Sequence, residues 1–436
     1  MQTRFSAQQL ENPDLFESEK ILRACVHCGF CLATCPTYLE LGDELDSPRG
    51  RIYLIKDMLE NDKPASGQVV EHIDRCLSCL SCMTTCPSGV NYMHLVDYAR
   101  VRIEESGRRP WTDRMLRIAL AKVLPNPALF RRTLSLARLA RPFARLLPKR
   151  LRAMAEMAPA TLPRLEAGNA PQRFPAQGTR RMRVALLAGC VQPILSPQIN
   201  AATVRLLTRH GVEVVIAGNA GCCGALVHHL GRRGDALESA RANVAAWTAL
   251  EAKEPLDAIV INAAGCGTMV KDYGYLLRND PQYAEAAARI SGLARDVTEI
   301  VRDLGLPPAK PPGEIRVAYH SACSLQHGQK LHDLGFELLS AAGFATRHVP
   351  DGHLCCGSAG TYNLLEPELA SALAARKAAS IERLAPDVVA AGNIGCIVQI
   401  GRSLARPVVH TVELLDWATG GPCPPALTSA SGRAPD

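Results

Sequence analysis

The sequence predicts a fold of the α plus α/β class, in which a helical, cysteine-rich N-terminal domain precedes a duplicated pair of α/β domains. Two tight cysteine runs lie within residues 1–100. A second set of cysteines recurs twice within residues 184–420, where short β-branched runs alternate with longer amphipathic stretches. The length of 436 residues also exceeds what one compact core of ordinary size contains.

The distribution of cysteine and charge along the chain predicts five segments. We expect a cysteine-rich domain over residues 1–100, a basic helical linker over 101–183, two α/β domains over 184–305 and 306–420, and a flexible tail over 421–436.

The composition is typical of a folded protein in a reducing compartment. Apolar residues make up 47% and charged residues 21% of the chain. We find neither a long apolar run nor an apolar leader, so we expect no transmembrane helix and no secretory signal, and we predict a cytoplasmic protein. In such a protein, 17 cysteines favour metal ligation over disulfides. Cys423, in the Pro/Gly-rich tail, is expected to be uninvolved.

The first cysteine zone contains two copies of C-x2-C-x2-C-x3-C-P, which read CVHCGFCLATCP from Cys25 and CLSCLSCMTTCP from Cys76. This spacing holds [4Fe–4S] clusters in bacterial two-cluster ferredoxins, where the fourth cysteine of each run binds the other cluster. We therefore predict a two-cluster ferredoxin-like domain. The first [4Fe–4S] cluster is assigned to Cys25, Cys28, Cys31 and Cys86, and the second to Cys76, Cys79, Cys82 and Cys35. Structural zinc is the alternative, but four-thiolate zinc sites usually combine two C-x2-C pairs.

The segment between the two runs is expected to be helical. SPRGRIYLIKDMLE has a helix-start signal at Ser47 and continues with helical periodicity. Its Arg49 and Arg51 either face a cluster or a partner protein, or are solvated. The second interpretation is favoured because arginine is mostly exposed in folded proteins.

Residues 184–420 contain an internal repeat of C-x31-C-C-G, followed by a further cysteine after 42 residues in one copy and 39 in the other. Every cysteine of the repeat comes at the end of a predicted strand or in the turn after it. Because ligands of open α/β sheets bind at the carboxyl ends of the strands, we expect each copy to bring four thiols together. They are Cys190, Cys222, Cys223 and Cys266 in the first copy, and Cys323, Cys355, Cys356 and Cys396 in the second.

Four thiols per copy suffice for a further iron–sulfur cluster or another metal, and buried inert cysteines are the alternative. The recurrence of the whole array favours binding. Five histidines lie near these cysteines, and one of them is a candidate for proton-coupled reduction of a quinone. They are His228, His229, His320, His327 and His353.

The linker concentrates the basic charge of the chain. Between Arg131 and Arg183 there are 13 Lys and Arg residues and two acidic ones. ALFRRTLSLARLARPFARLLPKRLRAM is predicted to form a basic amphipathic helix, which is typical of membrane-surface segments. The alternative is a helix packed between domains with a solvated arginine face. Nucleic-acid binding is not expected, because interleaved aromatic residues are missing.

Several motifs together resemble those of one family. ILRACVHCGFCLATCPTY, GDELDSPRGRIYLIK, RCLSCLSCMTTCPSGV, AGCCGA and HLCCGSAGTY are similar to the iron–sulfur subunits of bacterial glycolate oxidase (glycolate dehydrogenase), over roughly residues 1–415. The ferredoxin motif alone is shared by many proteins. Its combination with two Cys-Cys-Gly domains in this order is much narrower.

The resemblance implies an electron-transfer subunit of an oxidoreductase complex. In that family, FAD-binding partner subunits oxidise glycolate to glyoxylate, and the iron–sulfur subunit passes the electrons toward the respiratory chain. We therefore expect FAD-binding partners, quinone as a candidate acceptor, and peripheral contact with the inner face of the cytoplasmic membrane. The chain has none of the motifs G-x-G-x-x-G, G-x-S-x-G or H-E-x-x-H, so no catalytic residue is assigned.

The chain departs from the fuller Cys-Cys-Gly pattern, which ends in C-x-x-C. Here the corresponding segments are CGTM from Cys266 and CIVQ from Cys396, so a five-cysteine cluster and heterodisulfide chemistry are not expected. Two other functions stay open. One is an equivalent electron-transfer subunit for lactate, glycerol 3-phosphate or another hydroxy acid, and the other is a cluster-based redox or iron sensor.

Overall fold

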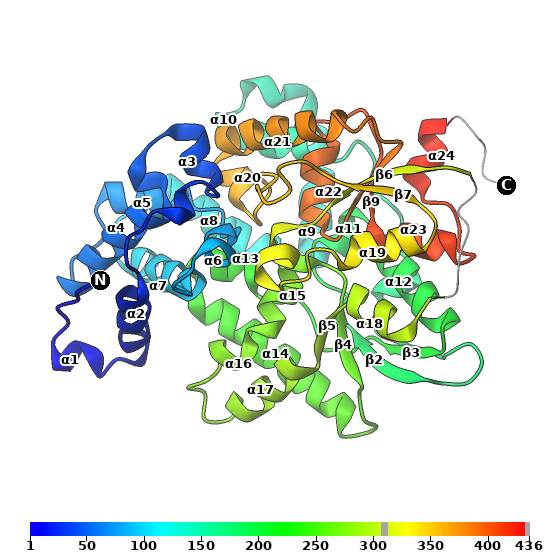
Figure 1. Ribbon diagram of the computed structural model, residues 1–436, viewed down its shortest axis with the longest axis horizontal. Coiled ribbons are helices and arrows are strands. Elements are labelled where there is room, and N and C mark those ends of the chain that lie inside the picture. The colour runs from blue at the N-terminus through cyan, green and yellow to red at the C-terminus, as the bar shows by residue number, and fades with distance from the viewer. Residues whose placement is uncertain (307–312, 432–436) are drawn as a thin grey trace.

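The computed structural model describes residues 1–306 and 313–431. Its first 172 residues form helices and turns, and the first strand begins at Arg173. The helices of the N-terminal part are α1 (Ala7–Leu10), α2 (Pro13–Ala24), α3 (Pro36–Leu41), α4 (Pro48–Glu60), α5 (Gly67–Asp74), α6 (Ser81–Thr85) and α7 (Tyr92–Glu105), with 3-10 turns η1 (Phe30–Leu32) and η2 (Glu44–Asp46). They form one end of the molecule (Figure 1).

Helix α4 begins where the sequence predicts. The Ser47 hydroxyl accepts a hydrogen bond from the Gly50 amide, and Pro48 occupies the first helical position, where a missing N–H costs nothing. The buried residues Leu22, Ile55, Ile73 and Leu95 form the centre of this helical core.

The linker forms helices α8 (Trp111–Val123), α9 (Pro127–Ala140) and α10 (Lys149–Met157), with a 3-10 segment η3 (Arg141–Leu146). Leu120, Leu124 and Phe130 join the core of the first α/β unit, beside Trp247. One face of these helices is therefore packed against the protein, while large apolar residues such as Leu139 remain exposed on the other.

The first α/β unit contains a five-stranded sheet in the order β1-β3-β2-β4-β5. Only β1 is antiparallel to its neighbour. The strands are β1 (Arg173–Phe174), β2 (Met182–Leu186), β3 (Val212–Val215), β4 (Ala258–Ile261) and β5 (Ala294–Asp296). The helices are α11 (Gln192–Leu195), α12 (Gln198–Arg209), α13 (Ala225–His229), α14 (Arg233–Glu251), α15 (Ala264–Lys271), α16 (Tyr273–Leu276), α17 (Ala284–Leu293) and α18 (Val297–Leu304).

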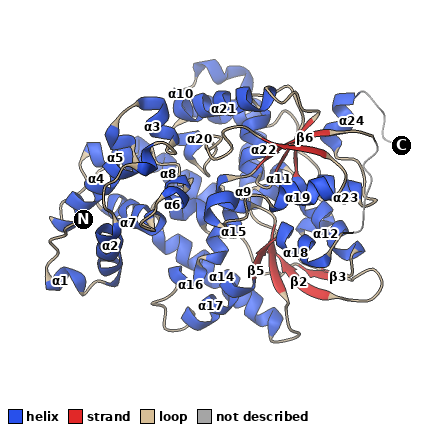
Figure 2. Cartoon of the chain, in the orientation of Figure 1, coloured by secondary structure: helices blue, strands red, loops and turns tan. Residues whose placement is uncertain are grey.

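The second α/β unit repeats this topology with a parallel sheet in the order β7-β6-β8-β9. Its strands are β6 (Arg316–His320), β7 (Ala345–His348), β8 (Val388–Ala391) and β9 (Val408–His410). Its helices are α19 (Leu334–Ala341), α20 (Tyr362–Leu365), α21 (Pro367–Glu382), α22 (Ile394–Gly401) and α23 (Thr411–Ala418), with a π-helical turn η5 (Ser324–Gly328). Figure 2 shows the two sheets as separate red layers among the helices.

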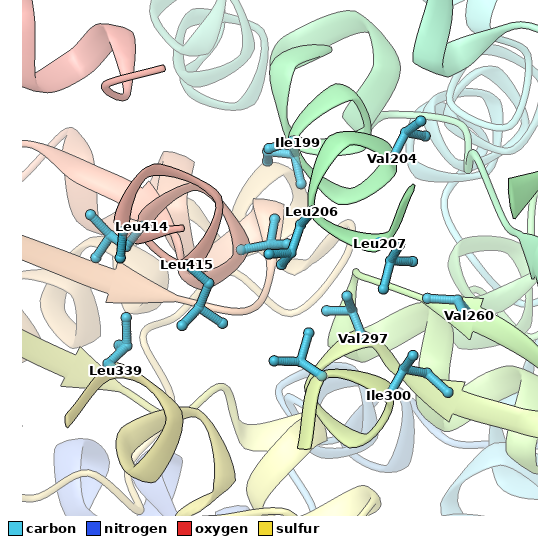
Figure 3. Packing of buried hydrophobic residues seen from close by; sticks show 14 of the residues in the cluster. Ile199, Val204, Leu206, Leu207, Val260, Val297, Ile300, Leu339, Leu414 and Leu415 are labelled. Atoms are coloured by element: carbon cyan, nitrogen blue, oxygen red, sulfur yellow. The ribbon is translucent and has the colours of Figure 1, made fainter. Parts of the chain in front are cut away.

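The two units share one hydrophobic core. Helices α12, α18, α19 and α23 contribute Ile199, Leu206, Ile300, Leu339 and Leu415 to it, together with strand residues of both sheets (Figure 3). The buried carboxylate of Asp416 in α23 pairs with two arginines of α12, Arg205 at 2.7 Å and Arg209 at 3.0 Å. The two units are thus fixed against each other by apolar and ionic contacts.

The C-terminal segment differs from the loose tail that the sequence predicts. Residues Pro425–Ser431 form helix α24, and Ala426 and Leu427 pack against the shared core. Packing of these two apolar side chains stabilises the helix, although the Pro, Gly and Ser content of the segment is typical of a loose tail. Residues 432–436 of the predicted tail lie outside the described residues.

Candidate functional site

Each N-terminal cysteine run curls into a loop that contains left-handed residues at matching positions. His27 and Ser78, which precede the second cysteine of each run, have φ angles of 57° and 48°. Gly29 and Leu80, which follow that cysteine, have φ angles of 85° and 64°. A non-glycine residue in this region costs about 1–3 kcal/mol and persists only where its surroundings impose it. The two loops are therefore preshaped by their contacts.

The thiols of these loops gather around two small cavities. The first cavity is lined by Cys25, Cys28, Cys31, Cys82 and Cys86. The second is lined by Cys35, Cys76, Cys79 and Cys82. The fourth cysteine of each run thus lies with the other run, and all 17 cysteines of the chain are free thiols.

The two cavities differ in exposure. Cys28 is exposed, and the first cavity is also lined by Val26 and Phe30, whose side chains are 66% and 62% exposed. All four cysteines of the second cavity are buried. Burial raises the pKa of the Cys79 and Cys82 thiols, so binding of a metal there displaces protons. The thiols of the first cavity therefore lie nearer the surface than those of the second.

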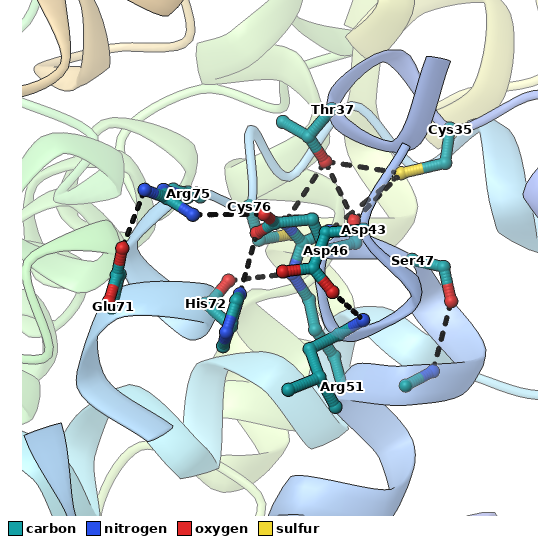
Figure 4. Close-up of polar contacts among 12 residues, drawn as sticks. Cys35, Thr37, Asp43, Asp46, Ser47, Arg51, Glu71, His72, Arg75 and Cys76 are labelled. Atoms are coloured by element: carbon teal, nitrogen blue, oxygen red, sulfur yellow. Dashed lines mark hydrogen bonds and ion pairs between the residues drawn. The ribbon is translucent and has the colours of Figure 1, made fainter. Parts of the chain in front are cut away.

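A buried ion-pair network borders the second cavity (Figure 4). Asp46, which is fully buried, lies 3.2 Å from Arg51, 3.0 Å from His72 and 3.0 Å from Arg75. Arg51 also donates a hydrogen bond of 3.7 Å to the sulfur of Cys35. Its cationic group thus faces the sulfur of a cysteine that the spacing assigns to a cluster.

The favoured interpretation of Arg51 as a solvated residue is wrong, because its side chain is only 1% exposed. The carboxylate of Asp46 compensates its charge, so burial becomes possible. Arg49 remains partly exposed, and it donates hydrogen bonds to Glu44 at 2.8 Å and to the His27 carbonyl at 3.3 Å. It therefore braces the first loop from outside.

The second cysteine run lies against the second α/β unit. Cys79 packs in one buried cluster with Cys355 and Tyr362, and Cys323 borders the same cluster. His327 in η5 contacts the Thr84 hydroxyl at 2.8 Å. The cysteines of the N-terminal domain thus continue directly into those of the repeat.

In each α/β unit the cysteines lie at the carboxyl ends of the parallel strands. In the first unit, Cys190 follows β2, Cys222 and Cys223 follow β3, and Cys266 lies in α15 after β4. Hydrogen bonds from the thiols of Cys190 and Cys223 lower the pKa of Cys222. The same contacts raise the pKa values of the two donors. The thiols of Cys190 and Cys223 therefore both contact the thiol of Cys222.

The second unit has the corresponding arrangement after β6, β7 and β8. The sulfurs of Cys323 and Cys355 are 3.9 Å apart. The amide of Asn393 donates to the sulfur of Cys396 at 3.6 Å. Gly357, with a φ of 86°, ends the Cys-Cys-Gly turn, and a Cβ there would meet the Ala370 carbonyl oxygen at 2.5 Å. Only glycine fits this turn.

A larger cavity of about 320 Å³ lies between the two units. Its wall includes seven of the eight repeat cysteines, namely Cys190, Cys223, Cys266, Cys323, Cys355, Cys356 and Cys396. The linker helices supply an apolar wall that includes Leu124, Phe130, Leu134 and Met154. Sequence reasoning missed this role of the linker. The apolar spacing of Phe130 and Leu134 was the available signal, but it does not say which surface the helix covers.

The residues at the two positions of the missing fifth cysteines, Met269 and Gln399, have structural roles. Met269 is buried in the core of the first unit. Gln399 donates a hydrogen bond to the Ala370 carbonyl at 3.1 Å and accepts one from Asn363 at 3.0 Å. Neither side chain acts as a substitute thiol.

The five predicted histidines occupy different surroundings. His228 and His229 pair with buried Asp97 at 3.3 and 3.7 Å. His327 contacts the His353 carbonyl at 3.2 Å in addition to Thr84. His320 is buried, and neither of its ring nitrogens has a hydrogen-bond partner. Of these five histidines, only His320 is buried with neither ring nitrogen hydrogen-bonded.

The donor set fits iron–sulfur chemistry. Thiols are the soft ligands that iron–sulfur clusters take, and here they gather in groups without forming disulfides. Residues 21–90 match the 4Fe-4S dicluster domain, and residues 184–271 and 317–401 each match the cysteine-rich domain. Iron–sulfur clusters are therefore the cofactors of this chain.

Two curated relatives match this chain over nearly the full length of both proteins, and a third matches about half of it. The glycolate oxidase iron-sulfur subunit of Escherichia coli is 45% identical over 96% of this chain and 99% of its own length. The probable glycolate oxidase iron-sulfur subunit of Bacillus subtilis is 30% identical over 96% of this chain and 99% of its own. Lactate utilization protein A of Bacillus licheniformis is 28% identical over 54% of this chain and 99% of its own.

A crystal structure of a hypothetical protein from Helicobacter pylori shares the fold, with a TM-score of 0.52 and 12% identity over 97% of this chain and 74% of that one. The resemblance seen in the motifs is confirmed by the full-length similarity to the two glycolate oxidase subunits. This chain belongs to the family of glycolate oxidase iron–sulfur subunits.

Proposed function

We propose that this chain is the electron-transfer subunit of a glycolate-oxidising complex, taking electrons from FAD-containing partner subunits and passing them toward the quinone pool. The observation that carries the proposal is the continuous series of thiol groups. It runs from the exposed first cavity through the buried second cavity to the wall of the large cavity. Bound iron–sulfur clusters supply single-electron steps, which suits division of the two-electron output of a flavin.

Within this proposal, the two cavities of the N-terminal domain hold one [4Fe–4S] cluster each. Cys25, Cys28, Cys31 and Cys86 hold the first, and Cys35, Cys76, Cys79 and Cys82 hold the second. Arg51 and the buried Asp46 network orient Cys35 and offset the negative charge of its thiolate. Burial of this set excludes water from the inner cluster.

The partner flavoprotein docks at the first cavity. Exposed Val26 and Phe30 line this cavity together with exposed Cys28, and exposed Tyr53 packs on His27 of the same loop at a ring distance of 4.3 Å. Exposed aromatic and aliphatic side chains are typical of interfaces. Electrons thus enter where the thiols lie closest to the surface.

The acceptor binds in the large cavity. Leu77 and Ser78 of the second cysteine run line this cavity, so an electron leaving the inner cluster reaches it directly. A cavity of about 320 Å³ with a mostly apolar wall and few polar groups suits a quinone head group. The linker helices that form its apolar wall are also those with the exposed apolar face.

The linker contacts the cytoplasmic face of the membrane in this proposal. Leu136, Leu139, Phe143 and Leu146 are 64–83% exposed, and exposed arginines lie among them. An apolar face edged by basic residues is what binds an interface containing anionic lipid. Within the described parts of the chain, no helix combines the length and apolar character that a membrane span requires.

Neutralising the linker should release the protein from anionic vesicles. Arg132, Arg138, Arg141 and Arg145 are exposed, whereas Arg131 donates to the Pro163 carbonyl and is left in place. Changing the four to glutamine should weaken binding to phosphatidylglycerol-containing vesicles at least about tenfold in sedimentation, since each basic residue contributes about 1 kcal/mol. Glutamine at exposed Arg302, Arg347, Arg383 and Arg406 is the control. Equal binding of both variants would refute lipid contact by the linker.

Iron content and glycolate-dependent reduction test the function itself. The anaerobically purified chain should contain at least about eight iron and eight sulfide per chain, the content of two [4Fe–4S] clusters. Mixed with its FAD-binding partners, it should be reduced by glycolate and reoxidised by a soluble quinone analogue. Reduction by lactate or glycerol 3-phosphate but not by glycolate would assign the subunit to another hydroxy acid. Clusters that no reduced flavoprotein reduces would favour a sensor.

A further inference from the structure

The second α/β unit has a buried histidine where the first has a leucine. His320 ends β6 and precedes Cys323 by the same spacing that separates Leu187 from Cys190. The two side chains are equally hidden, at 1% and 2% exposure. Leucine needs no polar partner there, whereas both ring nitrogens of His320 are buried without one. Buried polar groups nearly always have a hydrogen-bond partner or a ligand, so this imidazole indicates a bound group at the site.

The donors that face His320 are thiols. A ring nitrogen of His320 and the sulfurs of Cys356 and Cys396 all lie within 4.8 Å of one another, and each residue is at most 2% exposed. Zinc binds nitrogen at about 2.0–2.1 Å and sulfur at about 2.3 Å, so two ligands of one ion are at most about 4.6 Å apart. In a [4Fe–4S] cluster each cysteine binds a different iron, which spreads the sulfurs further apart. The 4.8 Å limit on this group is close to the spread of ligands around one ion.

Two further side chains complete the surroundings of this group. The thiol of Cys355 contacts the thiols of Cys323 and Cys356. It lies outside the group whose donor atoms are all within 4.8 Å, so it becomes a fourth ligand only when its side chain shifts toward the ion. The amide of Asn393 donates to the sulfur of Cys396 at 3.6 Å, which orients a ligating thiolate. Among the described residues, no three donors of the first unit reach the same spacing.

The charge of the site also differs between the two units. The glycines after the paired cysteines contact Ala236 in α14 and Ala370 in α21. Two helical turns further along, α14 has Asn243, whereas α21 has Lys377. Lys377 is 2% exposed, donates to the Asp351 carbonyl at 2.9 Å and faces the thiols of the second unit.

The positive charge of Lys377 would balance the net negative charge of an occupied metal site. A divalent ion with three thiolates and a neutral imidazole carries one net negative charge, and a buried cation beside it offsets that charge. Asn243 in the first unit instead hydrogen-bonds the backbone of Gly221 and Cys222. The second copy thus differs from the first at two matched positions. It has the histidine ligand where the first has Leu187, and a lysine counter-charge where the first has Asn243.

We propose that the second α/β unit binds a single zinc-type divalent ion through His320, Cys356, Cys396 and Cys355. The ion closes a four-coordinate site and ties together the turns after β6, β7 and β8, which form one wall of the large cavity. Zinc does not change its oxidation state, so the site shapes the cavity and carries no electrons. This metal site is expected whichever substrate the flavoprotein partner oxidises.

Metal analysis of the full chain tests this site. Protein produced with iron and zinc both in excess, and purified anaerobically, should contain about one zinc per chain in addition to its iron. His320→Leu, which installs the residue of the first copy, should lower zinc affinity at least about tenfold against a competing chelator. Leu187→Met, a change at the matching position of the first copy, should leave zinc unchanged. Iron content should be the same in all three proteins.

Three results would overturn the proposal. They are wild-type protein without zinc, zinc in His320→Leu held as tightly as in the wild type, and loss of iron instead of zinc from that variant. If His320→Leu fails to fold, His320→Cys tests the site instead. This variant should retain the zinc, because the new cysteine supplies a fourth thiolate. After replacement of zinc by Co²⁺, this variant should gain sulfur-to-metal charge-transfer absorption. A cysteine variant without bound zinc would count against the site. None of these readouts depends on glycolate oxidation.

Discussion

Replacing Cys79 with serine should abolish electron transfer through the chain while glycolate still reduces the flavin of the partner subunits. Cys79 lines the second cavity and packs against Cys355, so it lies between the N-terminal thiols and the repeat. A serine oxygen is a much harder ligand than a thiolate and binds iron poorly. Glycolate-dependent reduction of a quinone analogue by the reconstituted complex should fall by about 100-fold or more. Flavin absorbance, followed in the same experiment, should bleach normally.

Two variants make this test specific. Cys28→Ser changes the exposed thiol of the first cavity and should block electron entry into the chain. In electron paramagnetic resonance, this variant should lose the signals of the first cluster, whereas Cys79→Ser should lose those of the second. Cys423→Ser is the control, because Cys423 belongs to neither cysteine set and its thiol hydrogen-bonds the neighbouring Pro424 carbonyl at 3.8 Å. Unchanged iron content and turnover in Cys79→Ser would refute the ligand assignment.

The second large effect is expected on stability. Asp46→Asn should lower the free energy of unfolding by about 3–5 kcal/mol, because it leaves the buried guanidinium of Arg51 without its counter-charge. Asp46 also contacts His72 and Arg75, so the substitution weakens three charged contacts and not only the one with Arg51. Urea unfolding of the anaerobic holoprotein measures the change, and iron content reports damage to the second cavity.

An exposed ion pair provides the matched control for this change. Asp57 pairs with Lys63 at 3.3 Å, and the two side chains are 64% and 57% exposed. Asp57→Asn should change stability by less than about 1 kcal/mol, because solvent screens such pairs. A similarly small effect of Asp46→Asn would show that the buried network does not stabilise the domain.

Local patterns made part of the fold predictable. The β-branched runs around Val184, Val214 and Ile259 predict strands, and the structure has β2, β3 and β4 there in a mostly parallel sheet. Ser47 and Pro48 likewise predict the start of α4. These signals lie within a few residues of the element that they specify, so a single stretch of sequence contains them.

The features that the sequence did not predict depend on non-local contacts. Arginine is usually exposed, and nothing near Arg51 in the sequence shows that Asp46, His72 and a cysteine sulfur surround it. The helical C-terminal segment depends on the core that receives Leu427. The linker's second role, as a wall of the large cavity, depends on where α9 lies.

The sequence by itself determined the chemistry of this protein. Thiols at C-x2-C-x2-C-x3-C-P spacing and in two Cys-Cys-Gly copies specify iron–sulfur ligation and the family, because ligand type and spacing are written along the chain. Only the tertiary structure decided which groups meet. The buried cluster that contains Cys79 and Cys355 and the cavity between the copies both join residues far apart in sequence. The burial of His320 without a hydrogen-bond partner is likewise a property of the folded chain. Packing of whole domains creates such contacts, and no local pattern encodes them.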